Sequence, residues 1–134
     1  MNKHSLRVLS ITEPYATLIH DGIKTIETRG WKTNYRGELY IHASSTRIPK
    51  AWRENENLMS LVKSDLNFGK IICVCDLVDC VEITQRYIYQ MKNWYPQEYA
   101  CGFYEVGRYA WILDNIQGIF PIKAKGKLGI WNLN

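Results

Sequence analysis

Residues 70–83 read Lys-Ile-Ile-Cys-Val-Cys-Asp-Leu-Val-Asp-Cys-Val-Glu-Ile, a long and nearly continuous run of β-branched and other apolar side chains. Such residues favour strands, and a strand that is apolar on both faces is typical of the inside of a sheet. We therefore expect Lys70–Ile83 to be the central strand. Asp76 and Asp79 interrupt the run, and because an unpaired carboxylate is costly to bury, each is expected to accept hydrogen bonds.

Shorter strands are expected on both sides of this run. Alternation of apolar and polar residues predicts strands over Ser5–Ile11, Thr25–Trp31, Gly37–Ser44, Tyr109–Asp114, Pro121–Lys125 and Leu128–Leu133. Turn-forming residues at Asn115–Gly118 and at Gly126 separate the last three strands. We expect the strand Thr25–Trp31 to pair with the strand Gly37–Ser44.

The same patterns predict three helices, which cover Thr12–Asp21, Ile48–Leu66 and Thr84–Met91. Thr12 and Thr84 are the expected N-caps, because a threonine hydroxyl can accept a hydrogen bond from the first helical turn. Gly22 is expected to end the first helix. The segment Asn93–Tyr104 is rich in aromatic residues and contains a proline and a glycine, so we expect an irregular loop that forms one wall of a pocket.

The predicted elements indicate an α+β fold. Strands outnumber helices, and tight turns between strands favour antiparallel or mixed pairing, so we expect a small β-barrel or curled sheet of about five to seven mixed strands, flanked by two or three helices. A length of 134 residues with 46% hydrophobic content fits a single domain over residues 1–134. No segment approaches the roughly 20 apolar residues that span a bilayer, and we expect no membrane association.

Metal and disulfide chemistry are not indicated by the sequence. The four cysteines contain no Cys-x-x-Cys pair, three of them lie within the expected central strand, and the three histidines are scattered. We therefore expect buried free thiols, no metal site and no cofactor. Without a disulfide framework, the cytoplasm is the expected compartment.

The positive charge is concentrated in one part of the chain. Between Asp21 and Arg53 there are seven basic and three acidic residues, so this segment alone accounts for the net charge of +4. A local excess of this kind favours an anionic partner such as a nucleic acid. A solvated charged surface would give the same count, and the sequence leaves that alternative open.

Side chains that can carry chemistry gather in the same part of the chain. A period of two places Glu27 and Arg29 on one strand face, where both can orient toward a base or a phosphate. Lys24 suits a phosphate or, if desolvated, activation as a base or nucleophile. Trp31 and Trp111 can stack on a base or pack in the core. The candidate binding residues are Lys24, Glu27, Arg29, Trp31, Arg36, His42, Ser44 and Trp111.

An ordered set of residues extends from about Leu6 to Leu133. It comprises Leu9-Ser10-Ile11, Pro14, Ala16, Gly22-x-Lys24-x-x-Glu27-x-Arg29, Trp31, Arg36-Gly37, Ile41-His42-Ala43-Ser44, Asp76-Leu77-Val78-Asp79-Cys80, Trp111 and Gly129-Ile130-Trp131. This set resembles the ASCH domain, the homology domain of activating signal cointegrator 1. The resemblance implies a PUA-like β-barrel flanked by helices, binding of RNA or another nucleic acid, and a cleft beside the Gly-x-Lys-x-x-Glu-x-Arg element.

The same resemblance implies an alternative function. Some small ASCH proteins hydrolyse N4-acylated cytidine with a lysine, a threonine and a glutamate. The motif alignment places the lysine on Lys24 and the threonine on Glu27, and Glu98 and Glu105 are the candidates for the late glutamate. The alternative is therefore an amidohydrolase of N4-acylated cytidine-type nucleosides, in which Lys24 activates the attack and Glu27 moves protons.

Binding remains the first hypothesis. We expect RNA or single-stranded nucleic acid as the partner, or a nucleoside-like small molecule. Lys24, Arg29 and Arg36 are expected to meet phosphates, while Glu27 and His42 contact a base. A third possibility is a regulatory domain whose cleft holds a small metabolite without chemistry.

Overall fold

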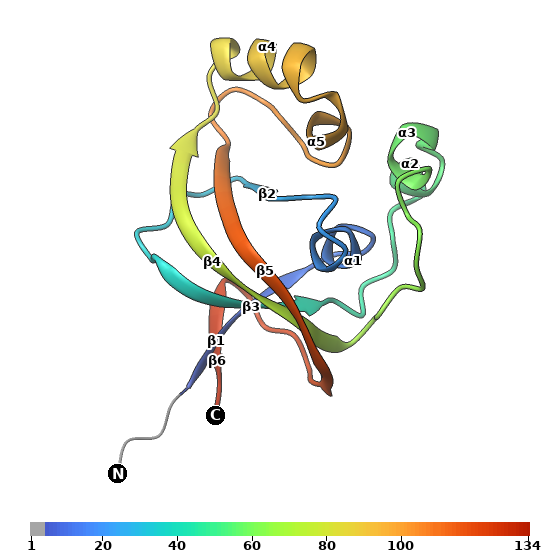
Figure 1. Cartoon of the computed structure of the whole chain (residues 1–134), viewed down its shortest axis with the longest axis vertical. Helices are drawn as coiled ribbons and strands as arrows, with labels where there is room; N and C mark the ends of the chain where they lie inside the picture. The colour runs from blue at the N-terminus through green and yellow to red at the C-terminus, as the bar shows by residue number, and fades with distance from the viewer. Residues whose placement is uncertain (1–4) are drawn as a thin grey trace.

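In the computed structural model, which describes residues 5–134, six strands form one curled, half-barrel sheet (Figure 1). The first four residues of the predicted domain lie outside the described part. The order of the strands across the sheet is β2-β5-β4-β3-β1-β6. The strands are β1 (Leu6–Ile11), β2 (Ile26–Arg29), β3 (Gly37–Ala43), β4 (Lys70–Glu82), β5 (Tyr109–Lys123) and β6 (Ile130–Leu133).

The long apolar run is the inner strand that its composition predicts. β4 pairs antiparallel with β3 on one side and with β5 on the other. β1 runs parallel to β3 and antiparallel to β6, so the sheet is mixed. The α+β class and the curled mixed sheet are therefore confirmed. Asp76 and Asp79 lie where the pairing of β4 with β5 shifts register, at the edge of the apolar core.

Two predictions about strands are wrong. β2 pairs with β5, placing Glu27 opposite Trp111, and not with β3. The predicted strands Tyr109–Asp114 and Pro121–Lys125 form one continuous β5, because the residues between them make irregularities in the ladder and no reversal of the chain. Asn115 adopts a positive φ of 52° there. Bulges use the same residue types as turns, so the local sequence does not separate the two.

The described chain has five short helices, where the sequence indicated two or three. They are α1 (Tyr15–His20), α2 (Lys50–Arg53), α3 (Glu56–Met59), α4 (Gln85–Trp94) and α5 (Pro96–Ala100). α1 lies inside the curl of the sheet, and its Ala16 and Ile19 join the main core with residues of β1, β3, β4 and β5 (Figure 1). α4 and α5 lie together beyond one end of the sheet.

The helix ends explain which predictions were met. Thr84 caps α4 as expected, accepting a hydrogen bond from the backbone of Tyr87. Thr12 does not cap α1; the Glu13 carboxylate instead accepts hydrogen bonds from the backbone and hydroxyl of Thr17. The long helix predicted over 48–66 is divided, because Asn55 turns into an extended conformation and caps α3 with its side chain.

The remaining expectations concern the loop, the thiols and the membrane. The segment predicted as an irregular loop after Asn93 contains the end of α4 and all of α5, which begins with a proline, a favoured first helical residue. All four cysteines are free thiols, and three are buried. Within residues 5–134, no helix has the length and apolar character needed to cross a membrane.

Candidate functional site

Lys24 lies just after the turn that ends α1, and its side chain is 0% exposed. Its Nζ donates a hydrogen bond of 2.6 Å to the carbonyl oxygen of Ile26 and another to that of Cys101, and lies 3.6 Å from Glu27 Oε1. Nζ is also 4.7 Å from the centre of the Tyr15 ring. The ammonium therefore ties the turn to β2 and to the residues after α5, and it is not presented to a phosphate.

Glu27 and Arg29 project from the same face of β2, as the period of two requires. Arg29 Nε lies 3.1 Å from Glu27 Oε2, off the line of its N–H bond, so this contact is an ion pair and not an aligned hydrogen bond. Arg29 Nη2 donates a 2.8 Å hydrogen bond to the carbonyl oxygen of Ser10 in β1. Lys24, Glu27 and Arg29 thus form a row of alternating charges that runs from the interior toward the surface.

A cleft of about 300 Å³ opens beside this row of charges, and we call it the inner cleft. Its aromatic members are Tyr15, Trp31, Trp52 and Phe103, and its charged members are Glu27, Arg29 and Arg108. The Arg108 guanidinium lies 4.5 Å from the centre of the Phe103 ring and donates to the carbonyl oxygen of Thr28. Aromatic walls with a few charged groups suit a small planar ligand that carries polar edges.

The proton states of two groups near Lys24 limit the chemistry of the cleft. Burial, followed by the Glu27 carboxylate, raises the pKa of Tyr15 to about 12, so the phenol stays neutral. Burial also raises the pKa of Cys101 to about 12, although Lys24 acts in the opposite direction. Cys101 is therefore a thiol at neutral pH and not the thiolate that nucleophilic catalysis requires.

The other residues proposed from the sequence occupy different places. Trp111 is 0% exposed and packs edge-on beneath Trp31, with ring centres 4.7 Å apart, so it supports the cleft without lining it. Arg36 donates hydrogen bonds to the carbonyl oxygens of Thr33 and Tyr35. Its guanidinium lies 3.8 Å from Asp79 and does not line the inner cleft.

His42 is buried in a hydrogen-bonded network. Its Nε2 lies 2.8 Å from the carbonyl oxygen of Ala124, and because a carbonyl only accepts, Nε2 carries a proton. Its Nδ1 lies 2.9 Å from Ser10 Oγ, which also accepts a hydrogen bond from Trp131 Nε1. His42 thus holds the segment between β5 and β6 against β1 and β3, and it is covered from solvent.

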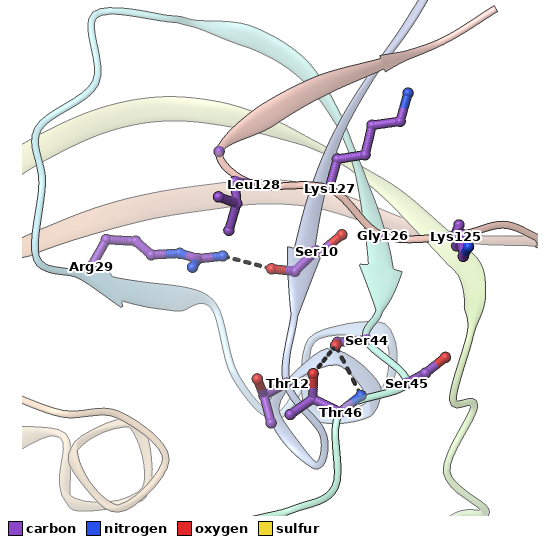
Figure 2. Close-up of a pocket in the computed structure, with 11 residues that line it drawn as sticks. Ser10, Thr12, Arg29, Ser44, Ser45, Thr46, Lys125, Gly126, Lys127 and Leu128 are labelled. Atoms are coloured by element: carbon purple, nitrogen blue, oxygen red, sulfur yellow. Dashed lines mark hydrogen bonds between the residues drawn. The ribbon is translucent and has the colours of Figure 1, made fainter.

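A second hollow of about 530 Å³ adjoins the inner cleft and shares Thr12 and Arg29 with it; we call it the outer groove (Figure 2). Arg29 enters from β2, and the hydroxyls of Ser44, Ser45 and Thr46 follow the end of β3. The segment between β5 and β6 forms the opposite side, with Lys125, Gly126, Lys127, Leu128 and Gly129. Of the predicted binding residues, Arg29 and Ser44 line this groove.

The sequence interpretation missed Lys125 and Lys127. The acidic residues between 54 and 122 offset the basic C-terminal part in the net charge of the second half of the chain. A usable signal was present in the alternation Lys123-Ala-Lys-Gly-Lys127, because a period of two places three lysines on one side of an extended segment.

Gly126 lies very close to the hydrogen-bonded side chains of Ser10 and His42. A Cβ atom there would lie 2.9 Å from Ser10 Oγ and 3.0 Å from His42 Cε1, and hydrogen bonds hold both side chains in place. We expect Gly126→Ala to lower the free energy of unfolding by roughly 1–3 kcal/mol, as overpacking usually does. Urea denaturation measures the loss. Gly30→Ala is the control, because its Cβ would meet only Arg108 at 3.7 Å; equal losses for the two would contradict the expectation.

The comparisons with known proteins agree with this architecture. A sequence profile of the ASCH domain matches residues 9–124. The chain is 32% identical over 140 residues to human activating signal cointegrator 1 and 31% identical over 137 residues to the mouse protein. Each alignment covers 94% of this chain and 22% of the relative, so the chain spans about a fifth of the length of these curated relatives.

Solved structures show the same fold. The alignment with the ASCH protein of Zymomonas mobilis covers 87% of this chain and 72% of that protein's chain, with a TM-score of 0.54 and 19% identity. A single-substitution mutant of that protein matches 90% of this chain and 76% of its own, with a TM-score of 0.55 and 19% identity. At this level of identity the likeness concerns the fold alone.

Proposed function

Because the chain belongs to the ASCH domain family, whose fold is related to RNA-binding PUA-like domains, we propose that it binds nucleic acid by taking one unstacked base into the inner cleft. The observation that carries this proposal is the aromatic-walled cleft of about 300 Å³ with charged groups at its side. Proteins that recognise single-stranded nucleic acids commonly stack splayed-out bases on aromatic side chains and hydrogen-bond their edges.

The residues of the cleft would contact the base in different ways. Trp31 is 40% exposed and presents a face on which a base can stack. Glu27 is a pure acceptor, and its two oxygens retain lone pairs beyond the contacts with Lys24 and Arg29, so it can accept from an N–H group on the base edge. Arg108 also lines the cleft and adds donors there.

Trp31→Ala tests this assignment. Loss of one stacking platform should weaken the binding of a short single-stranded RNA by about 1–3 kcal/mol, which corresponds to about 5- to 150-fold in Kd. Fluorescence anisotropy with an end-labelled RNA measures the change. Trp94→Ala is the matched control, because Trp94 is 65% exposed and lies on α4 outside the inner cleft. Equal affinity of both variants and the unsubstituted protein would show that no base stacks on Trp31 in the cleft.

The geometry supports hydrolysis of N4-acylated cytidine less well. Lys24 Nζ donates hydrogen bonds to two carbonyl oxygens and lies 3.6 Å from Glu27 Oε1, and an ammonium held in this way has no lone pair for attack or proton removal. Glu98 accepts hydrogen bonds from Thr25 and Ile26, which fixes the turn before β2. Turnover of N4-acetylcytidine by the purified protein, followed by chromatography, would replace binding with hydrolysis as the proposed function.

A further inference from the structure

The basic surface of this protein continues beyond the inner cleft. A third hollow of about 570 Å³, here called the third groove, is lined by Lys70, Lys123 and Lys125 together with Ser45 and Phe68. It shares Ser45 and Lys125 with the outer groove, which in turn shares Thr12 and Arg29 with the inner cleft. Neighbouring hollows therefore share lining residues, in the order inner cleft, outer groove and third groove, and we call this series the path.

The side chains along this path have the character of an anion site. The outer and third grooves are lined by Arg29 and four lysines, accompanied by serine and threonine hydroxyls. Among the described residues that line these two grooves, none is acidic. Cations and hydroxyls of this kind are the usual partners of phosphate oxygens, and flexible lysines suit a backbone whose exact course varies.

The sheet places two of these lysines, Lys70 and Lys123, opposite each other. Lys70 in β4 lies directly opposite Lys123 in β5, so their side chains leave the sheet on the same face. Like charges directly opposite each other in a sheet are destabilising. Ala124, between Lys123 and Lys125, is fixed by its N–H bond to the Gly69 carbonyl oxygen and by the His42 hydrogen bond to its own carbonyl oxygen.

We propose that the outer and third grooves form a track for the phosphodiester backbone of the strand whose base occupies the inner cleft. The proposal rests on the proposed function for the occupant of that cleft. Arg29 meets the phosphate nearest the base, Lys125 and Lys127 the next, and Lys70 with Lys123 a phosphate further along. The ligand is accordingly an extended single strand, and a free nucleoside uses only one end of the site.

Two double substitutions test the track. Lys125→Gln with Lys127→Gln removes charge from the outer groove, and Lys70→Gln with Lys123→Gln removes it from the third groove. For a labelled single-stranded RNA of about eight nucleotides, each pair should raise Kd roughly tenfold at low salt. Each should also reduce the slope of log K against log salt by about 0.7, because one single-strand phosphate contact is lost. The control is Lys63→Gln with Lys92→Gln, which makes the same change of charge outside the three hollows.

Further measurements separate the track from an effect on folding and from the base site. Lys70→Gln with Lys123→Gln should not lower stability in urea, since it relieves repulsion. An abasic oligomer of the same length should bind more weakly than the RNA and lose most of its affinity in both lysine variants.

If the abasic oligomer binds as tightly as the RNA and Trp31→Ala has no effect, the track stands and the base site fails. If the lysine variants keep the affinity and salt slope of the unsubstituted protein, or if that protein binds no oligonucleotide, the track is overturned.

Discussion

Lys24→Met is expected to lower the free energy of unfolding by about 3–5 kcal/mol, the usual result of removing one partner from a buried ion pair. The methionine fills similar space but donates no hydrogen bonds. The carbonyl oxygens of Ile26 and Cys101 lose their donor, and the buried Glu27 carboxylate keeps only its contact with Arg29. Urea denaturation, with the midpoint and slope compared between variants, measures the loss.

Two further variants identify the origin of that loss. Lys32→Met changes an exposed lysine and should alter stability by no more than about 0.5 kcal/mol. Adding Glu27→Gln to Lys24→Met should cost much less than Glu27→Gln alone, because the charge partner is already absent. A loss near 1 kcal/mol for Lys24→Met, or simple additivity of Lys24→Met and Glu27→Gln, would show that the contacts of Lys24 with Ile26, Cys101 and Glu27 contribute little to stability.

This role changes the interpretation of the Gly-x-Lys-x-x-Glu-x-Arg element. Its lysine bonds to the carbonyl oxygen of Cys101, 77 residues further along the chain. That bond joins the turn before β2 to the residue after α5, two residues before Phe103, which lines the inner cleft. Lys24 therefore supports the cleft, Glu27 lines it, and Arg29, at the end of the same strand, lines both the cleft and the outer groove.

Local pattern was sufficient for the elements whose form depends on near neighbours. The apolar run of β4 identifies an inner strand, because only a strand covered on both faces needs such a composition. The proximity of Glu27 and Arg29 follows from the pleat alone. Thr84 caps α4 because its hydroxyl and the backbone of Tyr87 lie within one helical turn.

Features that depend on distant contacts could not be predicted in this way. Lys24 has an ordinary turn sequence around it, and its burial follows from the packing of Tyr15 and Cys101. The alternation of β3 leaves His42 on the outer face, where the segment around Ala124 covers it. The outer groove is lined by segments that follow β1, β3 and β5, and no single stretch of sequence indicates that these segments lie together.

Trp111→Ala is expected to cost about 3–5 kcal/mol, the range for removing a large aromatic side chain from a core. Trp111 is the largest fully buried side chain of the described chain and belongs to the main core with residues of β1, β3, β4 and α1. Its Nε1 also donates a 3.2 Å hydrogen bond to the carbonyl oxygen of Trp31. Thermal or urea unfolding monitored by circular dichroism measures the loss independently of tryptophan fluorescence.

Two comparisons show whether Trp111 acts through packing and through Trp31. Trp94→Ala removes the same side chain from an exposed position on α4 and should change stability by no more than about 0.5 kcal/mol. Trp111→Phe keeps much of the buried area but leaves the Trp31 carbonyl oxygen without its donor, so its cost should fall between the two. Because Trp111 supports Trp31 from below, Trp111→Phe should also weaken RNA binding while the protein remains folded. Unchanged affinity in folded Trp111→Phe would mean that Trp31 keeps its position without this support.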